Sequence, residues 1–338
     1  MFTVKSLRAK VDRLPRVRIL NLPTPLHQLP RLSKTLKGPR LWMKRDDCTG
    51  LAFGGNKERK AEFVMADALK RKADVVVTTG PVQSNHSRAT AAAARKVGLR
   101  VVLVLKGKEP QEYDGNLLID NLLGADVRYV DSGKSGVNSL MGKVAEELKR
   151  EGHTPYIIPG GASYSVGAVA YVDAMLELVA QSKKNGIKID FLIHAAGSGG
   201  TQAGLVLANK ALDLGIEILG ISVEKDHDSC SHLASKTVDI ANEASKLLNA
   251  GVTINRKDVT VVEGYAGEGY EMLSSECLAA IRLVAQTEGI ILDPVYTGKA
   301  TAGLIDMARN RRFGKEDNVV FIHTGGTPAL FPYKEELV

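Results

Sequence analysis

The stretch Val75-Val76-Val77-Thr78 is followed by a helical pattern from Ser84 to Val97 and, after Gly98, by the run Val101-Val102-Leu103-Val104-Leu105. Short, continuously apolar strands separated by a helix are typical of parallel strands that are buried on both faces. The same alternation continues to Tyr156-Ile157-Ile158. This stretch therefore predicts an α/β fold whose parallel sheet is covered by helices.

The alternation resumes after a long predicted helix over 163–183. Further apolar strands are predicted at 191–193, 216–223, 259–262 and 319–322. Together the two stretches predict two open, mostly parallel twisted sheets flanked by helices. We expect two domains: a larger α/β domain formed by 1–54 and 164–338, and a smaller α/β domain formed by 55–163.

The composition is that of an ordinary globular protein, with 44% hydrophobic and 25% charged residues. No apolar run approaches the roughly 18 residues needed to cross a bilayer, and the first twenty residues lack the apolar core of an export signal. We therefore predict a cytoplasmic protein without membrane association. The cysteines Cys48, Cys230 and Cys277 form no CxxC pair, so we expect no metal site.

The net charge of +7 is concentrated near the N-terminus, where residues 1–45 hold 12 Lys and Arg against the single acidic residue Asp12. A basic arm of this kind can contact nucleic acid. This one is interrupted by prolines and lacks interleaved aromatic residues, which nucleic-acid arms use for stacking. We interpret it as a solvated strap across a domain or as part of a subunit contact, and we expect no nucleic-acid partner.

A lysine follows two glycines in Gly54-Gly55-Asn56-Lys57, just before a helical pattern. We expect Asn56 to cap this helix, which places Lys57 in its first turn. The positive end of the helix dipole lowers the pKa of a lysine there, which suits an amine that must lose its proton to form an imine. The pattern also fits a solvated surface lysine, which is how we interpret Lys60 on the same helix.

A glycine-rich turn, Gly197-Ser198-Gly199-Gly200-Thr201, follows a predicted strand and begins a helix. Glycines let backbone N–H groups converge, and a helix N-terminus favours an anion, so this turn predicts a phosphate cradle. The competing interpretation is a dinucleotide fingerprint. That pattern needs a glycine where Gln202 stands, although Glu224 ends the next strand where a ribose-binding acid is expected.

Polar and aromatic side chains follow other predicted strands. Ser84, Asn85 and His86 follow one strand and can bind a carboxylate or a ring oxygen, although Ser84 alone also fits a helix cap. Tyr296 and Tyr270 stand in irregular turns and fit either ring stacking or ordinary packing. An imine-forming lysine, a phosphate cradle and a stacking tyrosine together suit pyridoxal phosphate.

Five motifs resemble, in order and spacing, those of the D-cysteine desulfhydrase and 1-aminocyclopropane-1-carboxylate deaminase family of type II pyridoxal-phosphate enzymes. They are Gly54-Gly55-Asn56-Lys57-x-Arg59-Lys60, Gln83-Ser84-Asn85-His86-Ser87, Gly197-Ser198-Gly199-Gly200-Thr201-Gln202-Ala203-Gly204, Asp293-Pro294-Val295-Tyr296-Thr297-Gly298-Lys299 and His323-Thr324-Gly325-Gly326. The resemblance covers nearly the whole chain from about Thr24.

The resemblance implies the fold of type II pyridoxal-phosphate enzymes, a homodimer, and a role for each site residue. Lys57 would be the Schiff-base lysine and Gly197 to Thr201 would hold the phosphate. The ring would meet Asn85 at its oxygen, Tyr296 at its face and Thr324 at its nitrogen. Substrate would meet Ser84, Asn85, His86, Tyr270 and Thr297, and the resemblance makes Lys57, Ser84, Tyr270 and Tyr296 the catalytic set.

The residue after the site tyrosine distinguishes branches of this family. The cyclopropane-opening deaminases carry Glu there, whereas this chain has Thr297. The resemblance therefore implies a lyase that converts D-cysteine to pyruvate, ammonia and hydrogen sulfide by β-elimination. The alternatives are 1-aminocyclopropane-1-carboxylate deaminase, cysteate sulfo-lyase and, more remotely, a non-catalytic protein that carries the cofactor.

Overall fold

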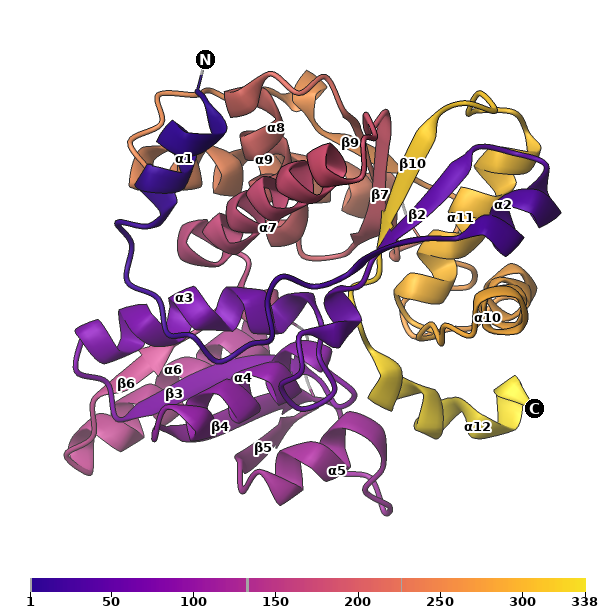
Figure 1. Ribbon diagram of the computed structural model, residues 1–338. Helices are drawn as coiled ribbons and strands as arrows, with labels where there is room; N and C mark the ends of the chain where they lie inside the picture. Colours follow the sequence, from indigo (N-terminus) through magenta and orange to yellow (C-terminus); the bar gives the residue numbers. More distant parts are fainter. Residues whose placement is uncertain (1, 132–133, 226) are drawn as a thin grey trace.

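A computed structural model describes residues 2–131, 134–225 and 227–338. Its strands form a six-stranded sheet in the order β1-β2-β10-β7-β8-β9 and a four-stranded sheet in the order β5-β4-β3-β6 (Figure 1). Among the described pairs, β1 and β2 run antiparallel and the others run parallel. The predicted fold class is thereby confirmed, whereas the domain boundaries at 54/55 and 163/164 stay a prediction.

The four-stranded sheet is buried on both faces because its strands carry apolar side chains on both. Val76, Val101 and Leu103 pack against helices α3 to α5, and Val75, Val77 and Val102 pack against α6. The elements are β3 (Val75–Pro81), β4 (Arg100–Lys106), β5 (Asp126–Val130), β6 (Pro155–Ile157), α3 (Asn56–Lys70), α4 (Asn85–Lys96), α5 (Gly115–Leu122) and α6 (Lys134–Arg150).

The six-stranded sheet is covered in the same way. Helices α1 (Val4–Val11), α7 (Ser165–Lys184), α8 (Gly200–Leu212) and α9 (His227–Leu247) share one apolar cluster, and α2 (Pro30–Leu36), α10 (Ser275–Glu288) and α11 (Thr297–Arg309) share another. Its strands are β1 (Leu26–Gln28), β2 (Arg40–Lys44), β7 (Phe191–Ala196), β8 (Glu217–Ser222), β9 (Thr260–Val262) and β10 (Asn318–Ile322). The short elements η1 (Asp46–Cys48), η2 (Gly160–Ala162), η3 (Arg256–Asp258), η4 (Thr327–Tyr333) and α12 (Lys334–Leu337) complete the described fold.

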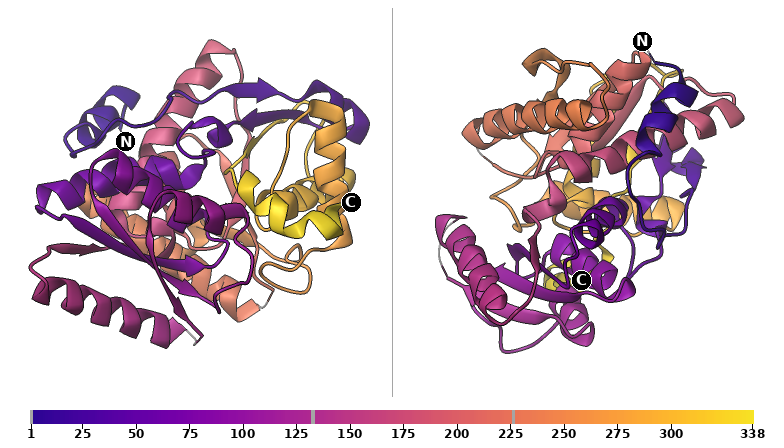
Figure 2. Two further views of the ribbon diagram at one scale, coloured as in Figure 1. Left: turned by 90° about the horizontal axis from the view of Figure 1, so that it is seen from below. Right: turned by 90° about the vertical axis from the view of Figure 1, so that its left-hand side faces the viewer.

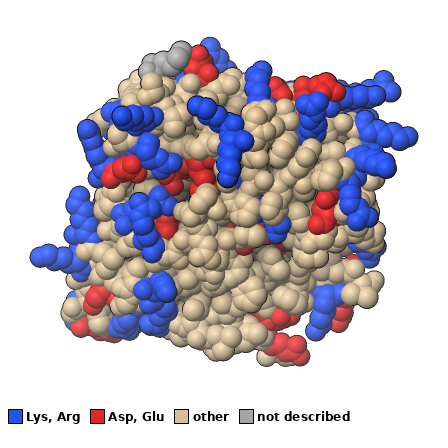
Figure 3. Space-filling view, in the orientation of Figure 1, with Lys and Arg blue, Asp and Glu red and all other residues tan. Residues whose placement is uncertain are grey.

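The basic N-terminal segment lies as a strap between the two sheets' helices (Figure 2). Arg16 donates from Nε to Glu62 on α3 at 2.6 Å and from Nη1 to Asp173 on α7 at 2.9 Å. Lys and Arg side chains are spread over this face rather than gathered into one continuous patch (Figure 3). The strap interpretation therefore agrees with the structure, although the segment also contains β1 and β2, which we did not predict. Within the described residues, no helix is long and apolar enough to cross a membrane.

Candidate active site

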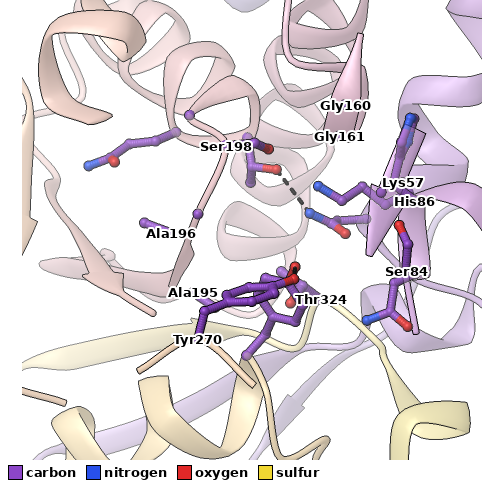
Figure 4. A pocket seen from close by; sticks show the side chains of 18 of the residues that line it. Lys57, Ser84, His86, Gly160, Gly161, Ala195, Ala196, Ser198, Tyr270 and Thr324 are labelled. Carbon is purple, nitrogen blue, oxygen red and sulfur yellow. Dashed lines mark hydrogen bonds between the residues drawn. The ribbon is translucent and has the colours of Figure 1, made fainter. Parts of the chain in front are cut away.

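A cavity of about 370 Å³ lies between the two sheets, where α3, α4 and α8 begin. Figure 4 shows Lys57, Ser84 and His86 on one side of it and Ser198, Ala195 and Ala196 on the other, with Tyr270 and Thr324 between them. Asn85, Gly197, Gly199, Thr201 and Tyr296 line it as well. The structure therefore brings together the predicted site residues other than Gly200 and Thr297.

Backbone geometry fixes the turn before Lys57. Gly54 has φ +71°, and a Cβ there would lie 1.9 Å from the carbonyl oxygen of Asp47, so the turn requires glycine. Helix α3 begins at Asn56 and its N-cap is Gly55. Our prediction that Asn56 caps the helix is wrong. Its backbone N–H donates to Thr324 O at 3.0 Å and its side chain donates to Thr201 Oγ1 at 3.0 Å, which ties the Lys57 turn to the loop after β10 and to α8.

Lys57 is half-buried in the first turn of α3, and its pKa is lowered to about 8. Burial is the main cause; the Glu58 carboxylate opposes it and the Lys236 ammonium adds to it. The lowered pKa agrees with our expectation, but its main cause is burial and not the helix dipole that the sequence suggests. An amine with this pKa is unprotonated in an appreciable fraction near neutral pH, as imine formation requires.

The predicted phosphate cradle, residues 197–201, connects β7 to α8. Its Gly199 is the N-cap of α8 with φ +86°, so the first N–H groups of α8 point toward the cavity end of the helix. Ser198 Oγ lies 2.6 Å from Ser163 Oγ, and Gly200 N–H donates to Ser163 Oγ at 3.3 Å. Gly200 itself lies behind the lining, next to Ser163.

Lys60 lies directly beside the cradle, which we did not predict from the sequence. Its side chain is fully buried, so our interpretation of a solvated surface lysine is wrong. Its Nζ donates to Gly161 O at 3.0 Å and lies 2.9 Å from the position that a Cβ on Gly200 would take. Burial lowers its pKa strongly, with Lys57 and Lys236 adding to the effect. A bound anion at this helix start would favour the charged form of the Lys60 amine, so the position suits an anionic ligand.

The orientation of Asn85 follows from a buried network behind it. Asn85 Oδ1 accepts from Asn116 Nδ2 at 2.9 Å, so the Asn85 amide N–H₂ is the group free to donate toward the cavity. Asn116 Oδ1 accepts in turn from Arg88 Nε at 2.8 Å. Arg88 also donates to Glu58 Oε1 at 2.9 Å and to Gly54 O at 3.0 Å. One buried arginine thus orients both Asn85 and the turn that carries Lys57.

The hydrogen bonds of His86 define its tautomer. Thr78 Oγ1 donates to Ile158 O at 2.9 Å, so it must accept from His86 Nε2–H at 2.8 Å. Nδ1 is then an acceptor. Burial, with the charges of Lys57 and Lys60, lowers the pKa of His86 well below its ordinary value. Ser84 is the N-cap of α4 and accepts from Ser87 N–H at 3.1 Å, which leaves its hydroxyl hydrogen for a ligand.

Tyr296 lies beside the cradle, since its Cε1 is 3.5 Å from where a Cβ on Gly197 would stand. Tyr270 meets it edge to face, with ring centroids 5.8 Å apart, and the two hydroxyl groups are hydrogen-bonded. Burial raises the pKa of both phenols. Both therefore carry their protons at neutral pH.

Thr297, predicted to bind substrate, does not line the cavity. It is buried at the start of α11, where its Oγ1 donates to Asp293 Oδ1 at 2.6 Å and its N–H donates to the same oxygen at 2.7 Å. Asp293 also accepts from Tyr296 N–H at 2.9 Å. Asp293 thus caps the turn that holds Tyr296 and Thr297, and a contact of Thr297 with substrate stays a prediction.

An amine suited to imine formation shares this cavity with a cradle suited to phosphate. Pyridoxal phosphate carries an aldehyde and a phosphate on one planar ring, so a single ligand accounts for both features. The two parallel sheets and the cavity between them thus define a pyridoxal-phosphate-dependent enzyme. The family model described as "Pyridoxal-phosphate dependent enzyme" matches residues 17–325, and the chain belongs to this family.

Individual relatives are similar over nearly their whole lengths. The D-cysteine desulfhydrase of Klebsiella pneumoniae (strain 342) is 41% identical over 332 residues, covering 97% of this chain and 98% of its own. That of Yersinia enterocolitica is 41% identical over 337 residues, covering 98% and 100%. A crystal structure described as an ACC deaminase homologue is 41% identical with a TM-score of 0.90, covering 98% of each chain.

Proposed function

We propose that this chain is a pyridoxal-phosphate-dependent lyase that converts D-cysteine to pyruvate, ammonia and hydrogen sulfide. The observation that carries the choice of substrate is the position of Thr297, whose hydroxyl and N–H both donate to Asp293 Oδ1. Because residue 297 is a threonine, where the cyclopropane-opening deaminases carry Glu, this position supplies no carboxylate to the cavity. The relatives in Klebsiella and Yersinia carry the desulfhydrase name, but relatives in Pyrococcus that are also 41% identical are named "Putative 1-aminocyclopropane-1-carboxylate deaminase", so the choice rests on Thr297.

The cofactor would be held by groups that the cavity already orients. Lys57 would bind its aldehyde carbon, and the cradle N–H groups with Lys60 would hold its phosphate. The Asn85 amide would donate to the ring oxygen and Thr324 would face the ring nitrogen. When bound, the cofactor supplies an electron sink that stabilises negative charge at the substrate Cα.

The side chains of this protein would then bind the substrate and move its protons. Ser84 would donate its hydroxyl hydrogen to the substrate carboxylate. The substrate amino group would take the place of Lys57 on the cofactor, and the Lys57 amine released in this way, with its pKa lowered to about 8, would take the proton from Cα. The thiolate leaves from Cβ, and the protonated hydroxyl pair of Tyr270 and Tyr296 would donate a proton to it.

A second candidate reaction is deamination of 1-aminocyclopropane-1-carboxylate, because the similar solved structure is described as an ACC deaminase homologue. We also propose a homodimer, as the family resemblance implies, and a location in the cytoplasm, as the lack of an export signal in the first twenty residues suggests. The candidate reactions differ in their substrates, so measuring the rate with each substrate distinguishes them.

The test is a comparison of kcat/KM for D-cysteine, L-cysteine, L-cysteate and 1-aminocyclopropane-1-carboxylate, with pyruvate, 2-oxobutanoate and sulfide measured separately. We expect D-cysteine to give the highest value and equal amounts of pyruvate and sulfide. A higher value for the cyclopropane substrate would replace the desulfhydrase by the deaminase, and a higher value for L-cysteate would replace it by the sulfo-lyase.

A further inference from the structure

Lys299 is a buried lysine that hydrogen-bonds to two backbone carbonyl groups. It lies in the first turn of α11 and is fully buried. Its Nζ donates to Ala266 O at 2.8 Å and to Gly269 O at 2.6 Å. Burial lowers its pKa, while the carboxylates of Asp293 and Glu271 raise it in part. Burying a lysine costs free energy, and the two carbonyls offset this cost by direct hydrogen bonds while the two carboxylates offset it by their charge.

The two carbonyls belong to the loop 263–274, which connects β9 to α10. This loop has little regular structure of its own: within the described residues, Met272 N–H to Gly269 O at 3.2 Å is its internal backbone hydrogen bond. Contacts from outside also reach it: Tyr265 Oη donates to Asp306 Oδ2 at 2.7 Å, Tyr333 Oη donates to Glu271 O at 2.8 Å, and Lys225 Nζ donates to Glu268 Oε2 at 3.4 Å. The Lys299 bonds hold the part of the loop directly before Tyr270.

Lys299 thereby joins the two tyrosines of the cavity. Tyr296 stands directly before α11, three residues before Lys299, and Tyr270 directly follows Gly269, whose carbonyl Lys299 binds. The ring of Tyr270 lies edge to face on Tyr296, and their hydroxyl groups are hydrogen-bonded. A shift of the loop by the length of one hydrogen bond would separate those hydroxyls.

We propose that Lys299 is a positioning residue that holds Tyr270 against Tyr296 by binding the carbonyl oxygens of Ala266 and Gly269. Its ammonium group suits this task because it offers three donors in different directions. Lys299 does not line the cavity and acts through Tyr270. The catalytic importance of this positioning rests on the proposed function, because that function gives Tyr270 a role in the reaction.

The first test needs no substrate. Hydrogen exchange of the holoenzyme is measured by mass spectrometry for Lys299→Met, which keeps the length of the side chain and removes its donors. We expect exchange in peptides from 264–273 to become about ten- to a hundred-fold faster, as loss of hydrogen bonds to a charged group implies. Peptides from α10 should keep their rates. Lys299→Gln keeps amide donors and should show a smaller change in exchange rate. It replaces Lys299→Met in the comparison if the Met variant does not fold.

The second test asks whether Lys299 acts through Tyr270. Values of kcat/KM for D-cysteine are compared for Lys299→Met, Tyr270→Phe and the double variant. If Lys299 positions Tyr270, the double variant matches Tyr270→Phe, because the hydroxyl that Lys299 positions is already absent. Tyr265→Phe removes the other loop contact on α11 and should leave kcat/KM unchanged.

Effects that multiply in the double variant would overturn the proposal, since they would show that Lys299 acts independently of Tyr270. Unchanged exchange in 264–273 for both Lys299 variants would overturn it as well. If the parent enzyme does not turn over D-cysteine, the proposed function fails, and the exchange measurement still decides the role of Lys299.

Discussion

The pKa of Lys57, lowered to about 8, makes its reaction with the cofactor sensitive to pH. Below that value the amine is mostly protonated and unreactive. We expect the rate at which apoprotein binds the cofactor covalently to rise about ten-fold per pH unit below pH 8 and to level off above it. Lys236→Gln removes a nearby positive charge and should move the midpoint to higher pH. Stopped-flow absorbance measures both, and a midpoint that stays fixed in the variant would contradict the electrostatic cause.

The identity of the anchoring lysine can be tested directly. Lys57→Ala should abolish covalent attachment and keep the fold, since alanine is a good helix former. Lys70→Ala, at the exposed end of the same helix, is the matched control for loss of one charge and should bind the cofactor covalently as the parent does. Borohydride reduction followed by peptide mapping locates the attachment. A pyridoxyl group on any lysine other than Lys57 would refute the assignment.

Lys60 gives a separate prediction, because it is fully buried beside the cradle. Lys60→Met should keep covalent attachment at Lys57 and weaken cofactor retention by about ten-fold or more, since a charge-assisted contact to phosphate is lost. Lys70→Met is the exposed control. Equilibrium dialysis measures retention, and equal retention by both variants would remove Lys60 from the cradle.

The positions of site residues could be predicted from the sequence where a local motif determines them. They could not be predicted where they depend on which side chains the fold buries. The turn before Lys57 and the cradle were predicted because glycines and a following helix are local signals. Lys60 was misjudged because burial depends on the packing of α3 against η2 and α7. Its spacing was nevertheless a signal: three residues after Lys57, it lies on the same face of the helix. The position of Thr297 outside the cavity lining could not be predicted, because the sequence does not show that the Asp293 carboxylate caps the turn that contains it.

At the scale of elements, the start of α8 gives a prediction about the cradle. Gly199 has φ +86°, and a Cβ there would lie 2.8 Å from Thr237 Oγ1. Gly199→Asp should therefore strain the turn and repel phosphate, lowering cofactor affinity by about ten-fold or more, or about 1.4 kcal/mol.

The matched control is Gly215→Asp. Gly215 also has a positive φ, +68°, but no atom lies within 4 Å of a Cβ built there. Cofactor retention on dialysis should fall in Gly199→Asp and stay at the parent value in Gly215→Asp. If retention fell equally in both, general backbone strain would be the cause and the cradle assignment would lose its support.

The strands also show which elements can be predicted from the sequence and which cannot. β3 and β4 were predicted because their apolar runs are continuous and a helix separates them. β1 and β2 were missed because β1 has three residues and both stand among prolines and basic residues. β1 pairs with β2 nearby, but β2 also pairs with β10, far along the chain, and local patterns do not reveal that pairing.

At the scale of the whole molecule, a buried ionic cluster joins α3, α7 and β2. Arg59 donates to Glu177 Oε1 at 2.9 Å and to Asp46 Oδ1 at 2.8 Å, and Lys44 also contacts Glu177. Burial alone would raise the pKa of Glu177, but Arg59 and Lys44 lower it to about 2. A carboxylate with this pKa contributes stability above its unfolded value of 4.5 and loses it as pH falls toward 2.

We therefore expect the urea midpoint of the holoenzyme to fall as pH decreases from about 4.5, with a contribution from Glu177 of about 3 kcal/mol. Glu177→Gln should be less stable at neutral pH, because Arg59 and Lys44 lose a buried partner. Its midpoint should also depend less on pH below 4.5. A variant whose acid sensitivity equals that of the parent would show that other carboxylates control it.

The pairing of β2 with β10 has a consequence for how the chain folds during its synthesis. Arg40 of β2 is opposite Asn318 of β10, so the six-stranded sheet cannot close until nearly all residues have left the ribosome. The strands of the other sheet lie between residues 75 and 157 and are complete long before. We expect the four-stranded unit to form early, while β2, paired on one side with β1, exposes its other side as an aggregation-prone edge until β10 is synthesised.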